Sequence, residues 1–459
     1  MNGYFLLKDK TKAMCDERIS FDTVKSLWRG FTCKMGEIEL DKGKDLTFSI
    51  GDATFEELSY ENEFSVCITE KGVGILAKNK PSLMRGIIAL MYNVDYTHDG
   101  ESMQLMIKCQ TIKDNYNIKN RMLHICVFPE TELDYLIKTI RIAGVCQYTH
   151  VVLEFWGMLK YDALKELAWE GYAMDKSTAK MLVDEIRAFG MEPIPMFNHL
   201  GHASQSRARY GKHVVLDQNP SLQYLFTPDG WCWDIESDYV KDFLKKIRYE
   251  IYEIFGNTEY FHLGCDEAYY ITRNDHLRSK LPDYLKFITE EVVKEGRRPM
   301  VWLDMLLPKS EYKDCYGVAK EEEAEKLFKS LAKETVGVDW QYNVKEAPVE
   351  SLEYFKDKGL DIIGAPWFGH ENMLSHVETV TKNDLFGLML TTWHTIYESF
   401  FHIQWCAYDM GAVEFPWGNS SAHTMMTSKL VRIVNFEDEC IPYEKCGWSD
   451  NQISTGGLK

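Results

Sequence analysis

The chain has 459 residues, 45% of them hydrophobic, which is enough for a large core and for more than one ordinary domain. The formal net charge is −18 and the chain has no basic tract, which argues against a nucleic-acid partner and against an anionic membrane surface. We expect no secretory signal, and the sequence contains no apolar run of membrane-spanning length. The twelve cysteines form no Cys-x-x-Cys pair. We therefore expect a soluble, cytoplasmic protein with reduced thiols.

The first part of the chain predicts a small α+β domain, which we assign to residues 1–115. Short β-like runs alternate with turns, and one stretch, 81–94, has apolar residues at helical spacing with Pro81 in its first turn. The β-like runs are 46–50, 63–69, 72–78 and 102–109. No cluster of His, Cys or acidic residues lies in this region, so we expect a scaffold role for it.

A different rhythm begins near residue 121. Eight short apolar runs follow one another, and helical patterns such as 175–190 fill most of the gaps between them; the runs are 121–128, 148–155, 192–199, 260–267, 299–305, 335–342, 361–368 and 385–394. Strands that alternate with helices indicate parallel βαβ units. Eight of them predict a (β/α)8 TIM barrel, assigned to residues 116–459, with an open doubly wound sheet as the alternative. No glycine-rich dinucleotide or phosphate loop follows the first run.

The expected strand ends carry unusual residues. In such barrels the active site lies at the carboxyl ends of the strands. Acids, histidines and tryptophans stand at most of these ends: Glu154, His199, Asp266, Glu267, Asp304, Trp340, Trp367, Trp393 and His394. The adjacent acids in "FHLGCDEAYY" end an apolar run, where two like charges would gain little from a purely structural role. The long connection 200–240 is the expected binding loop.

The strand ending in these acids carries a recognisable motif. His262, Gly264, Asp266 and Glu267 match every fixed position of His-x-Gly-x-Asp-Glu. On this motif the chain resembles the β-N-acetylhexosaminidases of glycoside hydrolase family 20. Further similarities fall in the expected order: the segment 60–90 resembles the small α/β domain that precedes the family's barrel, Arg121 stands at the start of the first strand, "NHLGHAS" has Leu200 in place of a proline, and "VWLDM" carries Trp302. The resemblance spans roughly residues 45–400.

The resemblance implies an exo-acting, retaining hydrolase of terminal β-linked N-acetylglucosamine or N-acetylgalactosamine, with the 2-acetamido group of the substrate as nucleophile. Glu267 would be the proton donor and later the base, and Asp266 would orient the acetamido group and stabilise the oxazolinium intermediate. The implied substrate-binding residues are Arg121, Glu154, His202, Trp302, Trp340, Trp367 and Trp393. We expect no metal and no cofactor, a small carbohydrate substrate, and either a monomer or a homodimer.

The chain also departs from the family pattern. Glu154 is the nearest residue to the family's aspartate that supports a pocket histidine. The seventh strand end reads "PWFGHEN", and at the eighth His394 and Thr395 follow Trp393 where the family has Trp-x-Glu. The resemblance assigns sugar hydroxyls to those acids, so no preference between gluco and galacto epimers is predicted.

Two alternatives from other classes stay open. One is a noncatalytic sugar-binding barrel protein, and the other is a metal-dependent barrel hydrolase that uses Asp266 and Glu267 as ligands. His199 and His202 lie three residues apart, but no third and fourth metal ligand is evident from the sequence.

Overall fold

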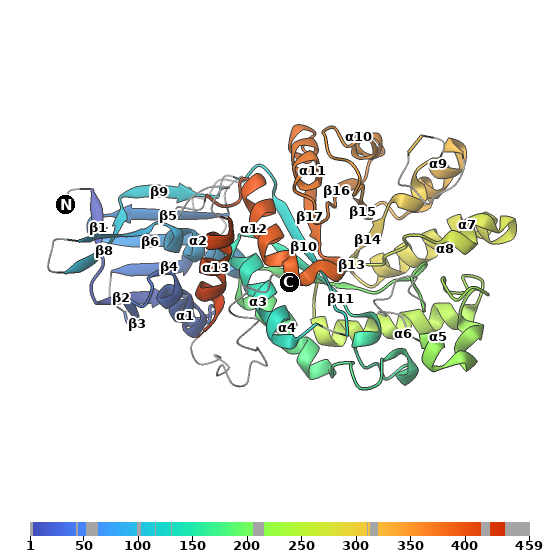
Figure 1. Cartoon of the computed structure of the whole chain (residues 1–459), viewed down its shortest axis with the longest axis horizontal. Coiled ribbons are helices and arrows are strands. Elements are labelled where there is room, and N and C mark those ends of the chain that lie inside the picture. Colours follow the sequence, from blue (N-terminus) through green and yellow to red (C-terminus); the bar gives the residue numbers. More distant parts are fainter. Residues whose placement is uncertain are drawn as a thin grey trace.

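The computed structural model describes residues 3–42, 45–51, 63–98, 102–114, 116–129, 131–204, 215–309, 311–312, 320–414 and 423–436. Its amino-terminal part is built on two sheets, which lie at the blue end of the chain in Figure 1. A six-stranded sheet has the order β3-β2-β4-β6-β5-β9, and a three-stranded sheet has the order β1-β8-β7. The strands are β1 (Tyr4–Leu6), β2 (Lys10–Cys15), β3 (Glu37–Leu40), β4 (Leu46–Ile50), β5 (Phe64–Thr69), β6 (Gly72–Ala77), β7 (Val94–His98), β8 (Met103–Lys108) and β9 (Gln110–Lys113).

Two helices, α1 (Phe21–Phe31) and α2 (Lys80–Tyr92), pack with the larger sheet. The Asn79 side chain caps α2 by accepting the Ser82 N–H at 2.8 Å, and Pro81 occupies the first turn. The predicted α+β character of this region and the positions of β4, β5, β6, β8 and α2 are confirmed.

The second part is a closed barrel of eight parallel strands. Each strand pairs with the next, and β10 pairs with β17 to close the ring. The strands are β10 (Asn120–Cys126), β11 (His150–Glu154), β12 (Glu192–Met196), β13 (Tyr260–His262), β14 (Arg298–Trp302), β15 (Val336–Asp339), β16 (Asp361–Gly364) and β17 (Gly387–Thr391). Every predicted strand is present, so the (β/α)8 prediction is confirmed and the open sheet was wrong.

Helices surround the barrel: α3 (Leu133–Val145), α4 (Lys176–Ala188), α5 (Val215–Gln218), α6 (Asp238–Phe255), α7 (Tyr269–Arg273), α8 (Asp275–Lys294), α9 (Glu321–Ser330), α10 (Glu350–Lys356), α11 (His370–Lys382) and α12 (Ser399–Asp409). Inside the barrel, alternate strand residues form a separate apolar cluster that includes Met122, Val152, Met300, Val338 and Met389. The barrel is therefore a packed core with polar groups only towards its ends.

The carboxyl-terminal helix α13 (His423–Val434) packs against both α1 and α3, so it bridges the small domain and the barrel (Figure 1). Between the two parts, β9 ends at Lys113 and β10 begins at Asn120. None of the described helices is both long and apolar enough to cross a membrane.

Candidate active site

The acidic pair lies in a loop and not in a strand. β13 ends at His262, and the next residues turn sharply, because Gly264, Cys265 and Glu267 have φ values of +69°, +78° and +51°. Two of these three are not glycine, and such left-handed conformations cluster at functional sites. In a strand, neighbouring side chains point to opposite faces. The turn removes that restriction, so Asp266 and Glu267 can face the same place.

The backbone of Glu267 is held on both sides. Its N–H donates to Asp304 Oδ2 at 3.0 Å, and its carbonyl oxygen accepts the Trp231 indole N–H at 2.7 Å and the Tyr269 N–H at 2.7 Å. These hydrogen bonds satisfy both polar groups of a strained residue, which fixes where its side chain begins.

His202 joins the two acids. Its Nε2 lies 3.1 Å from Asp266 Oδ2 and 3.2 Å from Glu267 Oε2. The imidazole lies beside the rings of Trp231 and Trp156, with centroids 4.5 Å and 5.5 Å away. A single nitrogen therefore contacts both carboxylates, as expected for a residue that polarises the acid pair.

A glycine makes this contact geometrically accessible. A Cβ on Gly201 would lie 2.0 Å from the Asp266 carbonyl oxygen, so only glycine lets the turn that carries His202 approach the acid loop.

The three carboxyl groups differ in burial. The side chain of Glu267 is 21% exposed and that of Asp266 is 7% exposed, whereas Asp304 is fully buried. Burial, and then the negative charge of Asp266, raise the pKa of Asp304 well above its ordinary value. Glu267 is thus the carboxyl group that solvent or a substrate reaches most easily.

Aromatic rings continue from the acid loop. Trp302 is buried next to His262, and its ring centroid lies 6.0 Å from that of Trp393. The indole N–H of Trp393 donates to the Tyr342 hydroxyl at 2.8 Å. Tyr342 also contacts Trp340 and Trp367, with centroids 5.0 Å and 5.3 Å away. The structure therefore brings the four predicted tryptophans into one chain of contacts, with Tyr342 as the link.

Glu154 supports a buried histidine inside the barrel, His124. One carboxylate oxygen lies 2.8 Å from His124 Nε2 and the other accepts the Asn198 side-chain N–H at 2.8 Å. All three residues are buried, and His124 packs beside Trp393 with centroids 4.7 Å apart. Glu154 therefore orients His124 and not His202, because the β11 and β10 strand ends are adjacent in the barrel.

The prediction for Arg121 was wrong. Arg121 is the second residue of β10, at the amino end of the strand, so it lies at the opposite end of the barrel from Glu267. Its guanidinium donates to the carbonyls of Gln147, Ile118 and Lys119, and lies 4.0 Å from the Tyr116 ring. The packing turns Arg121 towards the small domain.

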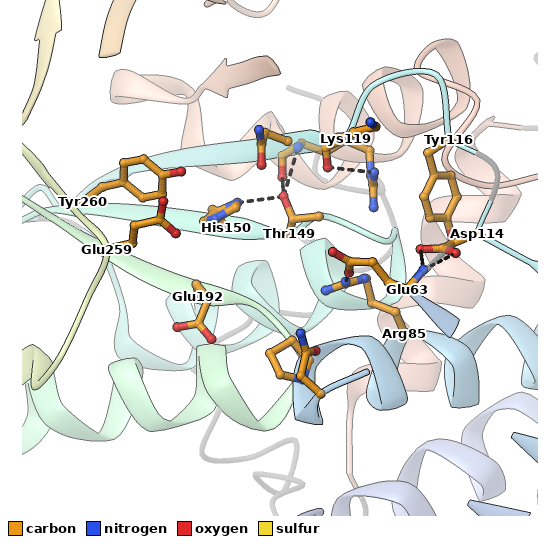
Figure 2. Close-up of a pocket in the computed structure, with 14 residues that line it drawn as sticks. Glu63, Arg85, Asp114, Tyr116, Lys119, Thr149, His150, Glu192, Glu259 and Tyr260 are labelled. Carbon is orange, nitrogen blue, oxygen red and sulfur yellow. Dashed lines mark hydrogen bonds and ion pairs between the residues drawn. The ribbon is translucent and has the colours of Figure 1, made fainter. Parts of the chain in front are cut away.

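Arg121 lines a separate polar cavity of about 340 Å³ between the small domain and the amino ends of the strands. Figure 2 shows Arg85 and Glu63 on one side of it and Glu192, Glu259 and Tyr260 on the other. Positive and negative groups are mixed along its walls, and burial lowers the pKa of His150 to about 3, so that this imidazole is neutral. This cavity does not contain the acid pair.

His199 also points away from the site. It is buried, with Nδ1 2.6 Å from the Phe197 carbonyl and Nε2 3.1 Å from Arg248 Nη1. It therefore belongs to the packing of α6. Residues 205–214 of the predicted binding loop lie outside the described residues.

Several residues of the site were missed as candidates. Trp231, Trp156 and Tyr342 carry no motif, although Trp231 lies in the long connection that was predicted to bind substrate, and Asn198 stands in "NHLGHAS" but was not singled out. His124 gave a weak signal as a histidine inside an apolar strand, and it reaches the site only because β10 and β11 are neighbours.

Within the described part of the chain, no group of three or more His, Cys, Asp or Glu residues is arranged to hold a metal ion. Asp266 and Glu267 share His202 as a close titratable neighbour.

A family model described as "Glycosyl hydrolase family 20, catalytic domain" matches residues 153–367, from β11 to the end of β16. The matched segment includes the acid pair, His202 and three of the four tryptophans. Residues 153–367 are therefore a family 20 catalytic domain. The chain is accordingly a glycoside hydrolase. A comparison with curated protein sequences found no match.

Solved family 20 structures share the fold over almost the whole chain. The chitobiase of Flavobacterium johnsoniae is 15% identical with a TM-score of 0.68, over 95% of this chain and 71% of that one. A mutant β-hexosaminidase of Streptomyces plicatus in complex with the product GlcNAc is 14% identical with a TM-score of 0.66, over 96% and 93%. The β-N-acetylhexosaminidase of Bacteroides fragilis is 14% identical with a TM-score of 0.65, over 98% and 94%. Likeness at these identities extends to the fold, including the domain that precedes the family 20 barrel.

Proposed function

We propose that this chain removes terminal β-linked N-acetylglucosamine or N-acetylgalactosamine from glycosides, with retention of configuration. The observation that carries the proposal is the contact of His202 Nε2 with both Asp266 and Glu267 at the mouth of a family 20 barrel. Similar structures contain N-acetylglucosamine, which supports a small carbohydrate substrate.

The reaction needs one proton donor and one charge stabiliser. The 2-acetamido oxygen of the sugar attacks C1, the bond from C1 to the leaving oxygen breaks, and Glu267 gives its proton to that oxygen. Asp266 stabilises the positive charge of the cyclic oxazolinium. Glu267 then takes a proton from the incoming water, whose oxygen adds to C1 and reopens the ring. In this scheme Glu267 exchanges protons and Asp266 keeps its charge, and Glu267 is also the more exposed of the two, so a leaving oxygen and a water can reach it.

A panel of chromogenic β-glycosides tests the substrate class. We expect hydrolysis of the N-acetylglucosaminide or the N-acetylgalactosaminide and no comparable turnover of the glucoside and galactoside. The reaction should survive a chelator, which separates it from a metal-dependent hydrolase. A β-glucoside turned over at a similar rate would rule out the acetamido group as nucleophile.

Leaving groups separate the two carboxylates. Glu267→Gln should lose about 10²–10⁴-fold in rate on a substrate with a poor leaving group and much less on a nitrophenolate, because a good leaving group needs little protonation. Asp266→Asn should lose rate on both substrates, since the oxazolinium forms with either leaving group. Equal rates of both variants and the wild type on both substrates would show that the acid pair has no catalytic part.

We also propose that the chain works in the cytoplasm or another reducing compartment. The nine described cysteines, out of twelve in the sequence, are all free thiols, and five of them are buried. A disulfide found by mass spectrometry of the unreduced native protein would contradict this.

A further inference from the structure

Asp304 is a third carboxyl group at the acid loop and has no role in the reaction as written above. It follows β14 and begins a short 3-10 helix, Asp304–Leu306. It is fully buried, its Oδ2 accepts the Glu267 N–H at 3.0 Å, and its Oδ1 has no hydrogen-bond partner among the described residues. A buried carboxyl oxygen without a partner is costly, so its presence calls for a reason.

The segment that contains Asp304 lies against the backbone of the proton donor. Besides the Glu267 N–H, the next amide, that of Ala268, lies 3.2 Å from Met305 Sδ. Glu267 itself has φ +51°, a conformation that a glutamate adopts only when its surroundings hold it there. The carbonyl side is held by Trp231 and Tyr269, and the amide side by Asp304.

The surrounding charges favour an uncharged Asp304. The titratable groups that act on it are Asp266, Glu267 and His202, and the buried Cys265 thiol also lies in range. An ionised Asp304 would add a third negative charge beside two carboxylates that share one imidazole. Burial and the charge of Asp266 raise the pKa of Asp304 and so favour its protonated form, in which the proton would sit on Oδ1, because Oδ2 accepts the Glu267 N–H.

We propose that Asp304 is a positioning residue of the catalytic site: a neutral carboxyl group whose Oδ2 holds Glu267 in its left-handed conformation and so aims the proton donor at the leaving oxygen. A neutral group performs this task without repelling Asp266, which must stay ionised. The kinetic consequences rest on the proposed function, whereas the anchor is a property of the folded chain.

Amide hydrogen exchange measured by mass spectrometry tests the anchor without any substrate. Asp304→Asn keeps a carbonyl oxygen that can accept the Glu267 N–H, and Asp304→Leu removes it. The matched control is Asp339→Leu, at another strand end, where the carboxyl group is also buried but bonds Ser351. In a peptide that contains residues 264–268, we expect Asp304→Leu to raise the exchange rate of the protected amide about 10-fold or more. Asp304→Asn and the control should stay near the wild type.

Unchanged exchange in Asp304→Leu would overturn the anchor, and so would equal exchange in Asp304→Asn and Asp304→Leu. These outcomes do not depend on activity. If the glycoside panel shows no hydrolysis of N-acetylhexosaminides, the proposed function fails. The amide exchange rates still show whether Asp304 holds the Glu267 N–H.

Kinetics test whether the anchor serves catalysis. On a poor leaving group, Asp304→Leu should lose about 10²-fold in kcat with KM nearly unchanged, and on a nitrophenolate less than about 10-fold, because only the proton donor is misplaced. Asp304→Asn should recover most of kcat and keep the wild-type pH profile. An equal loss on both substrates would mean a structural role only. A loss in Asp304→Asn as large as in Glu267→Gln would make Asp304 a proton carrier, and either result overturns the proposal.

Discussion

Gly264, the fixed glycine of the acid motif, can be tested through the free energy of unfolding. A Cβ at this position would lie 1.7 Å from Asn198 Oδ1, and the residue has φ +69°. Gly264→Ala therefore adds the strain of a left-handed alanine, about 1–2 kcal/mol. It also pushes away Asn198, whose side chain donates to the buried Glu154 carboxylate, and such a bond to a charged group contributes about 1.5–3 kcal/mol. The expected loss is about 2.5–5 kcal/mol.

Gly296→Ala is the matched control. Gly296 has φ +81°, and a Cβ there would meet nothing within 4 Å, so the same substitution adds only the strain, about 1–2 kcal/mol. Urea unfolding gives the free energy of unfolding of both variants. The difference between the two losses measures the clash with Asn198, because replacing glycine by alanine reduces the entropy of the unfolded chain equally in both variants. Equal destabilisation of the two variants would refute the view that Asn198 requires a glycine at 264.

Three further outcomes are expected. Burial raises the pKa of Asp339 to about 6, above its unfolded value of about 4, so its contribution to stability is full below pH 4 and is lost as pH rises from about 4 to about 6. Relative to Asp339→Asn, the wild type should lose about 2 kcal/mol between pH 4 and pH 7 in urea unfolding, and parallel curves would contradict this. Glu154→Leu leaves His124 without its buried partner and should cost at least about 2 kcal/mol, whereas an unchanged melting temperature would show that the contact is dispensable. Trp231→Phe removes the donor to the Glu267 carbonyl, so kcat on a poor leaving group should fall about 10-fold with a loss of stability of at most about 1.5 kcal/mol, and an unaltered kcat would assign Trp231 to packing.

The sequence predicted the barrel because its strands are buried on both faces. Such strands read as continuous apolar runs, and all eight were found, although each extends less far than its run. β13 is the clearest case. The apolar run continues to Cys265, but the strand ends at His262 and only Leu263 and Gly264 still bond the neighbouring segments, because Gly264 and Cys265 adopt left-handed conformations. In the small domain, β1, β2, β3, β7 and β9 were missed, since short strands with exposed polar residues lack that signal.

The candidate site was predicted as far as its motif reaches. Asp266, Glu267 and His202 lie together as the family pattern implies. Where a strand begins and which way each of its side chains points are decided by register, which the sequence alone does not give. Arg121 is an example: it lies at the amino end of β10, and three backbone carbonyls hold its side chain there. The partner of Glu154 could not be read from the sequence either, since His124 is 30 residues away along the chain.

The central claim is that the acetamido oxygen of the substrate is the nucleophile and that Glu267 and Asp266 assist it. A series of 4-nitrophenyl N-acyl-β-glucosaminides tests this most directly, with acetyl, fluoroacetyl, difluoroacetyl and trifluoroacetyl groups. Each fluorine makes the carbonyl oxygen a weaker nucleophile while the leaving group stays the same. If the acetamido oxygen attacks C1, kcat should fall steeply and continuously along the series, by orders of magnitude overall. A kcat that stays constant from acetyl to trifluoroacetyl would contradict it and would assign the attack on C1 to a group of the protein.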